Sequence, residues 1–273
     1  MKSSSTMKKK YPLLSVHSYV MLAFIYIPIV LIIIFSFNDS RMSTNWEGFT
    51  FGWYTSLFQN SRVLEALGNS LSIGVASTII STILGTMAAL AFRNMGKKAR
   101  VGFNGLLYLP IIVPEIIMGL SLLILFSQFQ IQLGKGTVLI AHITFSVSYV
   151  FVIISSRLAN MGKQLEEAAS DLGASAWQTF RYVTLPTIWP GIAAGALIAF
   201  TLSIDDFIIS FFVAGPNSTT LPIYIYSSVK RGISPEINAL CTLMIIASIL
   251  MIVLAQWLLN RGQGDKRSSV LPF

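Results

Sequence analysis

The chain has 273 residues, of which 54% are hydrophobic and only 11% are charged. A soluble domain carries about a quarter charged residues, so this composition excludes a chain whose whole surface faces water. The single cysteine, Cys241, and the two histidines exclude a disulfide framework and a metal site built from several such residues. We therefore expect an all-α membrane protein without a metal site, divided into spans of about 20 residues.

Six apolar runs predict six transmembrane helices. They cover roughly residues 17–37, 69–92, 106–126, 137–156, 188–213 and 239–259. The first run follows a lysine cluster but lacks a cleavage pattern, so we interpret it as a retained span and not as a signal peptide. The predicted organisation is an N-terminal tail at 1–16, a transmembrane domain at 17–260 and a C-terminal tail at 261–273.

The basic residues predict the orientation of these spans. Most of the 19 Lys and Arg residues fall on one side of a six-span chain. Because cytoplasmic loops carry an excess of Lys and Arg, both termini are expected to be cytoplasmic. The net charge of +8 then reflects topology, and we expect no nucleic-acid partner. The external loops are expected at 38–68, which is rich in aromatic residues, and at 214–238.

Glu115, Asp205 and Asp206 are the only acidic residues within the predicted spans. A charge at mid-bilayer costs about 2.5–3.5 kcal/mol on insertion scales, so such residues usually face a cavity or a partner. Pro110 and Pro114 precede Glu115 and predict a disturbed helix, which is tolerated where it borders a cavity. We expect no basic residue within the spans to neutralise the acids, which fits a cationic substrate.

Aromatic residues in the same spans are candidates to face ammonium groups, with apolar packing as the alternative. These candidates are Phe145, Tyr149, Phe207 and Phe211. On a continuous helix Asp205 and Asp206 point about 100° apart, so both cannot face one narrow path. One of them is then either protonated or hydrogen-bonded to a partner subunit. His142 is interpreted as a hydrogen-bonded residue at the start of the fourth span, not as a ligand.

The longest predicted cytoplasmic loop, residues 157–187, contains the signals for two short helices. Residues 165–172 favour a helix that ends at Gly173, because glycine accepts the left-handed conformation that closes a helix. Ser175 and Gln178 then have the spacing of a capping box, which begins a second helix.

The second helix of this loop is expected to stop at Pro186. Trp177 and Phe180 are three residues apart and share one face of it. An exposed aromatic face beside small residues indicates a surface that docks on another protein. The alternative is an amphipathic hairpin that rests on lipid headgroups.

The loop also resembles a known motif. The spacing of Glu167-Ala168-Ala169, Gly173 and Val183-Thr184-Leu185-Pro186 is similar to the EAA loop of ABC-importer permeases, with valine where isoleucine is usual. The resemblance implies a type I ABC-importer permease fold and a coupling helix that docks on a cytoplasmic ATPase. The residues implied in this coupling are Glu167, Ala168, Ala169, Gly173, Ala174, Ser175, Trp177 and Phe180.

The chain lacks a G-x-x-x-x-G-K-[ST] phosphate-binding loop of its own. We therefore expect that it is not an enzyme and binds no cofactor, and that ATP and Mg are bound by the separate ATPase.

Further segments, among them Pro114-Glu115, His142-Ile-Thr-Phe and Phe200–Asp206, are similar to PotC-type permeases of spermidine/putrescine importers over roughly residues 15–260. The resemblance implies polyamine import by alternating access across the bacterial inner membrane. It also implies three partners: a PotB-type permease, a PotA-type ATPase homodimer and a periplasmic or lipid-anchored PotD-type binding protein. One alternative is the same importer carrying another small solute, such as ferric ion or thiamine. Another is a membrane scaffold or enzyme without a transport role.

Overall fold

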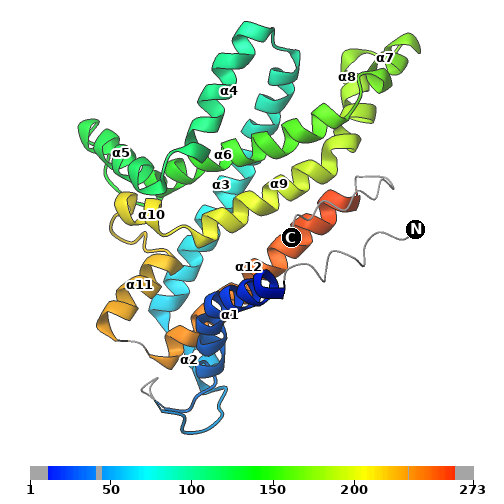
Figure 1. The fold of residues 1–273 in the computed structure, drawn as a ribbon. Coiled ribbons are helices and arrows are strands. Elements are labelled where there is room, and N and C mark those ends of the chain that lie inside the picture. Colours follow the sequence, from blue (N-terminus) through cyan, green and yellow to red (C-terminus); the bar gives the residue numbers. More distant parts are fainter. Residues whose placement is uncertain (1–11, 41–44, 233, 262–273) are drawn as a thin grey trace. The chain divides into compact units, whose positions relative to one another are not determined.

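The computed structural model describes residues 12–40, 45–232 and 234–261 (Figure 1). Within these residues the chain is helical apart from connecting segments, and the one pairing of extended backbone is an isolated bridge between Asn38 and Phe49. The predicted tails at 1–16 and 261–273 lie mostly outside the described residues. The described chain divides into two compact units, which we consider separately.

The prediction of an all-α membrane protein with about six spans is confirmed. Five helical stretches are long and apolar enough to cross a membrane, and a bent helix pair makes a sixth if it counts as one span. The five are Ser15–Phe35 within α1 (Pro12–Phe35), α3 (Ser61–Asn94), α6 (Lys135–Asn160), Ala176–Asp205, and Pro235–Leu258 within α12 (Pro235–Arg261). The bent pair is α4 (Lys97–Ile112) and α5 (Glu115–Gln128).

The third predicted span, 106–126, is not one continuous helix. Its two parts, α4 and α5, meet at an angle of 105°. Val113 is extended, with ψ of 129°, and Pro114 follows it. Proline lacks an N–H group and disfavours the helical conformation of the residue before it. The predicted disturbance is therefore a complete break, after which α5 begins at Glu115.

The fifth predicted span, 188–213, is also divided. Helix α9 (Leu185–Asp205) ends before Asp206, whose ψ of 121° is extended, and the short α10 (Ile208–Val213) follows. The prediction that Pro186 stops the preceding helix is wrong. Helix α8 (Ala176–Thr179) continues through a π-helical turn at Phe180–Thr184 into α9. Pro186 is accommodated because this turn already interrupts the regular α-helical bonding beside it.

Both predicted external loops contain helices. The segment 38–68 includes α2 (Gly52–Gln59) and the beginning of α3, and the segment 214–238 includes α11 (Leu221–Arg231) and the beginning of α12. Pro222 and Pro235 lie in the first turns of α11 and α12. Proline fits there because the first N–H groups of a helix have no partner within it.

The first unit takes the described residues up to Asn60 together with Ser227–Ile245. After α1, the ring of Phe37 lies within 5.1–5.4 Å of three other rings, those of Phe49, Phe51 and Tyr54. The fully buried Asn38 donates from Nδ2 to the carbonyl of Asn45 at 2.6 Å. These contacts join the residues directly after α1 to those directly before α2 and to its first turn.

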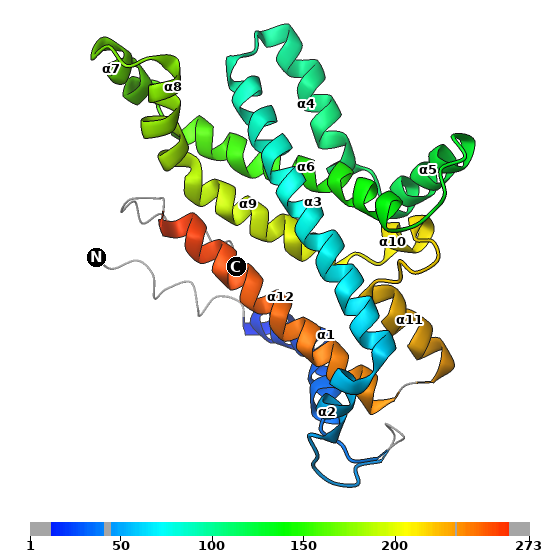
Figure 2. The same cartoon turned by 180° about the vertical axis from the view of Figure 1, so that it is seen from behind.

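The second unit is centred on α3, α6 and α9, which pack against one another (Figure 2). A buried cluster joins them, including Ala89 of α3, Val150 of α6 and Ile188 of α9. Gly85 lets α3 approach α6, because a Cβ at this position would lie 2.7 Å from Val150 Cγ1 and 3.1 Å from the backbone nitrogen of Phe151. Small residues commonly allow such close helix contacts in membranes.

This close approach predicts different effects for two alanine substitutions. Gly85→Ala should destabilise the chain by about 1–3 kcal/mol, because the backbone of α6 must move. Gly105→Ala in α4 is the control, since a Cβ there has no atom within 4 Å, and alanine favours a helix over glycine. Thermal unfolding in detergent, followed by tryptophan fluorescence, measures both. Equal unfolding midpoints would contradict tight packing at Gly85.

Candidate functional site

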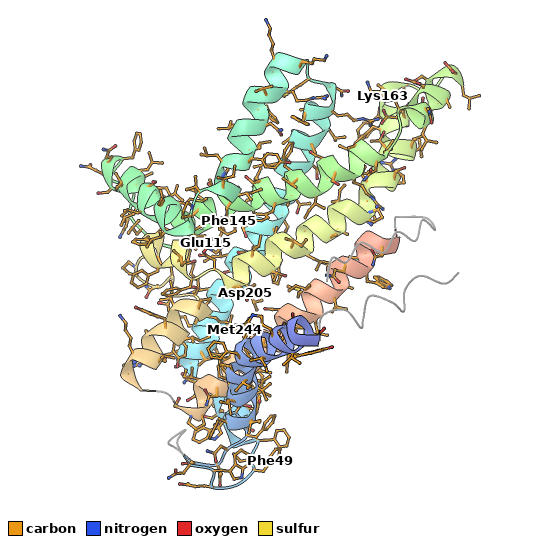
Figure 3. All side chains as sticks on the ribbon, in the orientation of Figure 1. Phe49, Glu115, Phe145, Lys163, Asp205 and Met244 are labelled. Carbon is orange, nitrogen blue, oxygen red and sulfur yellow. The ribbon has the colours of Figure 1, made fainter. Side chains whose placement is uncertain are left out.

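The predicted path residues converge on one cavity of about 380 Å³ in the second unit. Its wall is formed at the break between α4 and α5, along α6, and at the break between α9 and α10. Glu115, Phe145 and Asp205 lie close together in this part of the unit (Figure 3). Six of the seven predicted residues line the cavity: Glu115, Phe145, Tyr149, Asp205, Asp206 and Phe207.

Phe211, the seventh predicted residue, does not line the cavity. Its side chain is exposed, and its ring centroid lies 5.4 Å from that of Phe207 and 5.8 Å from that of Tyr226. The rings of Phe207 and Tyr226 are themselves 4.6 Å apart. Phe211 is therefore part of an aromatic cluster that reaches the cavity through Phe207.

Glu115 is exposed and is the first residue of α5, directly after the helix break. A carboxylate is favoured there because the N-terminus of a helix carries partial positive charge. Asp205 is also exposed and is the last residue of α9. Ser248 Oγ of α12 lies 3.1 Å from both of its carboxylate oxygens. Among the described lining residues there is no Lys, Arg or His, so the cavity is acidic.

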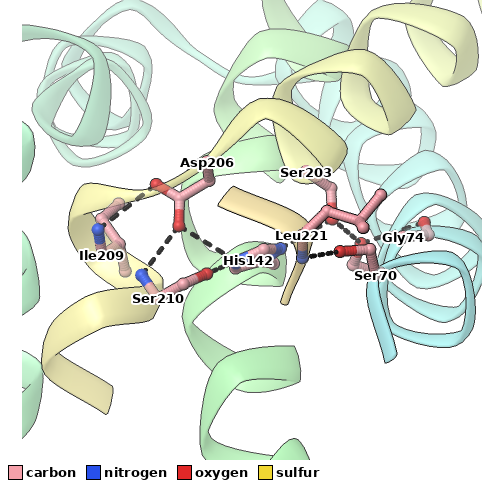
Figure 4. Close-up of polar contacts among 9 residues, drawn as sticks. Ser70, Gly74, His142, Ser203, Asp206, Ile209, Ser210 and Leu221 are labelled. Carbon is pink, nitrogen blue, oxygen red and sulfur yellow. Dashed lines mark hydrogen bonds and ion pairs between the residues drawn. The ribbon is translucent and has the colours of Figure 1, made fainter. Parts of the chain in front are cut away.

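Asp206 has a different environment, because its carboxylate is buried in a polar network (Figure 4). Asp206 Oδ2 lies 3.3 Å from Nε2 of His142, and the two side chains are 4% and 1% exposed. The same nitrogen is 2.9 Å from Ser210 Oγ, and Nδ1 is 2.6 Å from Ser203 Oγ. The expectation that no basic residue in the spans pairs with the acids is therefore wrong for Asp206.

The network also explains why the two neighbouring aspartates diverge. They do not share a continuous helix, because the chain leaves the helix at Asp206. The Asp206 carboxylate accepts hydrogen bonds from the backbone N–H groups of Ile209 at 3.3 Å and Ser210 at 2.7 Å. A carboxylate in this position satisfies N–H groups that the start of α10 leaves unpaired. Asp206 thus stabilises the helix break, while Asp205 remains exposed.

The interpretation of His142 is confirmed in one respect and wrong in another. The side chain is hydrogen-bonded, as expected. It does not lie at a helix end, because α6 begins at Lys135, and the residue is fully buried. Sequence reasoning assigned no role to Ser203, Ser210 or Ser248. Serine in an apolar span is a weak signal, because its hydroxyl often bonds within its own helix.

The hairpin at residues 164–180, which we name the coupling hairpin after its predicted role, agrees with its predicted local structure. Helix α7 (Gln164–Asp171) is followed by Gly173 with φ of +84°. The Ser175 backbone N–H donates to Gln178 Oε1 at 2.8 Å, and the Gln178 N–H donates to Ser175 Oγ at 3.3 Å. The predicted capping box is therefore confirmed.

The predicted aromatic face of the hairpin is present. The ring centroids of Trp177 and Phe180 are 5.6 Å apart, and Trp177 is 65% exposed. Leu172, at the turn, is 89% exposed. An apolar surface of this kind at a tight turn is typical of a protein contact.

Comparison with solved structures identifies the fold, and comparison with protein families identifies the class of protein. The fold matches a bacterial ABC transporter involved in the import of the acidic polysaccharide alginate, with a TM-score of 0.68, 17% identity, and coverage of 94% of this chain and 96% of the other. Together with the apolar spans, this likeness shows a multi-pass helical fold of the kind found in ABC-importer permeases. Residues 81–261 match the family described as binding-protein-dependent transport system inner membrane component, and the chain belongs to that family.

Two curated relatives are similar over most of their length. The spermidine/putrescine transport system permease protein PotC of Escherichia coli (strain K12) is 42% identical over 234 residues, which cover 86% of this chain and 89% of PotC. The putrescine transport system permease protein PotI of the same organism is 41% identical over 250 residues, which cover 89% of each chain.

Proposed function

We propose that this chain is the membrane-spanning permease subunit of an ATP-driven importer that moves polyamines, spermidine or putrescine, across the bacterial inner membrane by alternating access. The observation that carries the proposal is the acidic cavity, in which Glu115 and Asp205 are exposed and no described lining residue is basic. The identity with PotC and PotI supports the same cargo.

The chemistry of the cavity suits an elongated cation. A polyamine carries ammonium groups separated by methylenes, so it requires carboxylates at separate points with apolar surface between them. Glu115 and Asp205 come from different helices, and Phe145, Tyr149 and Phe207 line the same cavity. An aromatic face contributes about 0.5–2 kcal/mol to binding of an ammonium group. Such contacts hold a cargo transiently and permit its release.

The proposed assembly contains this chain, a PotB-type permease, a PotA-type ATPase homodimer and a PotD-type binding protein outside the membrane. ATP and Mg are bound by the ATPase, and this chain binds no cofactor. The eight predicted coupling residues form the contact with the ATPase. The exposed Trp177 and Leu172 support this assignment, because burial of both side chains would stabilise the contact.

Uptake of radiolabelled spermidine and putrescine tests the cargo. Cells without their own polyamine importers would express the four proposed components together. We expect accumulation that requires all components and disappears when the ATPase partner carries an inactivating substitution. An excess of unlabelled polyamine should compete, whereas ferric ion and thiamine should not. If the complex assembles and imports thiamine or ferric ion but no polyamine, the cargo is wrong.

A further inference from the structure

Glu166 joins three separate segments of the second unit. Its Oε1 accepts a hydrogen bond from Nη1 of Arg93 in α3 at 2.7 Å, and another from Oγ1 of Thr184 at 2.7 Å. The Arg93 side chain is 14% exposed and that of Glu166 is 27% exposed, so water screens the ion pair only in part. Hydrogen bonds between charged partners are stronger than neutral ones. One carboxylate oxygen therefore fixes the coupling hairpin to the end of α3 and to the π turn that leads into α9.

Thr184 differs from several threonines in the long helices. Several of those donate to the carbonyl four residues earlier: Thr86, Thr144, Thr187 and Thr201. Thr184 is the last residue of the π turn, is 4% exposed and donates to Glu166 instead. Single π turns inside α-helices occur frequently at functional sites. The residue that ends this π turn is thus also the one that donates a hydrogen bond to the hairpin.

The far end of α9 carries Asp205, and there α9 contacts α3 again. Ser77 Oγ of α3 donates to Ser203 Oγ of α9 at 3.1 Å, and Ser203 is bonded to His142. The 21 residues of α9 span about 30 Å at 1.5 Å per residue. Contacts therefore join α9 to α3 near both of its ends, through Glu166 at one and through Ser203 at the other.

We infer that Glu166 is a positioning residue that transmits movement of the coupling hairpin to α3 and α9, and so to the carboxylate of Asp205. This inference rests on the proposed transport function. The inferred role of Glu166 differs from that of its neighbour Glu167, the residue of the EAA motif. Glu167 is exposed, whereas Glu166 bonds within the chain.

The ratio of polyamine uptake to ATP hydrolysis by the complete complex in liposomes tests the inference. Glu166→Ala should leave an assembled complex that hydrolyses ATP, while uptake per ATP falls about fivefold, a typical size for loss of coupling between distant sites. Thr184→Val should lower the ratio in the same direction. Thr187→Val is the matched control, because its hydroxyl donates only to the carbonyl of Val183.

Exchange of the two charges tests the pairing itself. The double variant Arg93→Glu with Glu166→Arg should regain part of the ratio that each single variant loses. The inference is overturned if Glu166→Ala and Thr184→Val keep the parent ratio, or if uptake and hydrolysis fall in proportion, as a purely structural defect would cause. If Glu166→Ala does not assemble, Thr184→Val decides between these outcomes.

A failure of the proposed cargo can be told from a failure of this inference. If the parent complex imports no polyamine, the cargo is wrong. Stimulation of ATP hydrolysis by the binding protein should still be weaker in Thr184→Val than in Thr187→Val. Equal stimulation of ATP hydrolysis in these two variants would contradict the role inferred for Glu166.

Discussion

A His142→Phe chain is expected to unfold about 10 °C below the parent. Removal of the imidazole leaves the carboxylate of Asp206 and the hydroxyl groups of Ser203 and Ser210 without their shared partner. A buried polar group that is left without a hydrogen-bond partner costs about 1–3 kcal/mol, and three groups lose a partner here. In a chain of this size 1 kcal/mol corresponds to about 2–4 °C. Thermal unfolding in detergent measures the shift.

His17→Phe is the control for this prediction, because the chain has two histidines and His17 is exposed on α1. Its unfolding midpoint should equal that of the parent. His142→Asn, which retains a donor and an acceptor, should fall between the parent and His142→Phe. A midpoint for His142→Phe equal to that of His17→Phe would show that the buried network does not stabilise the fold.

Asp205→Asn and Glu115→Gln are each expected to lower polyamine uptake about tenfold or more without a change in the unfolding midpoint. Hydrogen bonds to a charged group are worth about 1.5–3 kcal/mol, and both substitutions remove a charge while keeping the shape of the side chain. Both carboxylates are exposed at the cavity, so the fold does not depend on them. Uptake of labelled spermidine at subsaturating concentration measures the effect.

Two neighbouring positions serve as controls. Ser248→Ala removes the hydroxyl that bonds to Asp205 but keeps the charge, and we expect only a small loss of uptake. Asp206→Asn should lower the unfolding midpoint, because this carboxylate is buried among hydrogen bonds. If Asp205→Asn and Glu115→Gln both take up polyamine at the parent rate, the cavity carboxylates do not bind the cargo.

The coupling hairpin was largely predictable because its structure is local. The positive φ of Gly173 is a property of one residue. The reciprocal hydrogen bonds of Ser175 and Gln178 join residues three positions apart. The membrane spans were predictable for a related reason, since hydropathy is a sum over adjacent residues. The prediction failed where Pro186 was expected to end a helix. A proline removes one N–H donor from a helix and leaves a backbone carbonyl without its partner. Neighbouring helices and a π turn can satisfy that carbonyl, and the sequence alone does not show either of them.

The sequence alone predicted a membrane permease with a coupling hairpin and three acidic residues in its spans, because composition, hydropathy and motif spacing are properties of adjacent residues. Only the tertiary structure separated Asp205 from Asp206. Ser248, the partner of Asp205, is 43 residues away, and Ser203 and Ser210 lie 61 and 68 residues from the histidine that joins them to Asp206. Likewise, Glu166 differs from Glu167 because Arg93 is 73 residues away. Adjacent residues of the same type acquire different roles when the packing of distant helices decides which carboxylate is buried and paired.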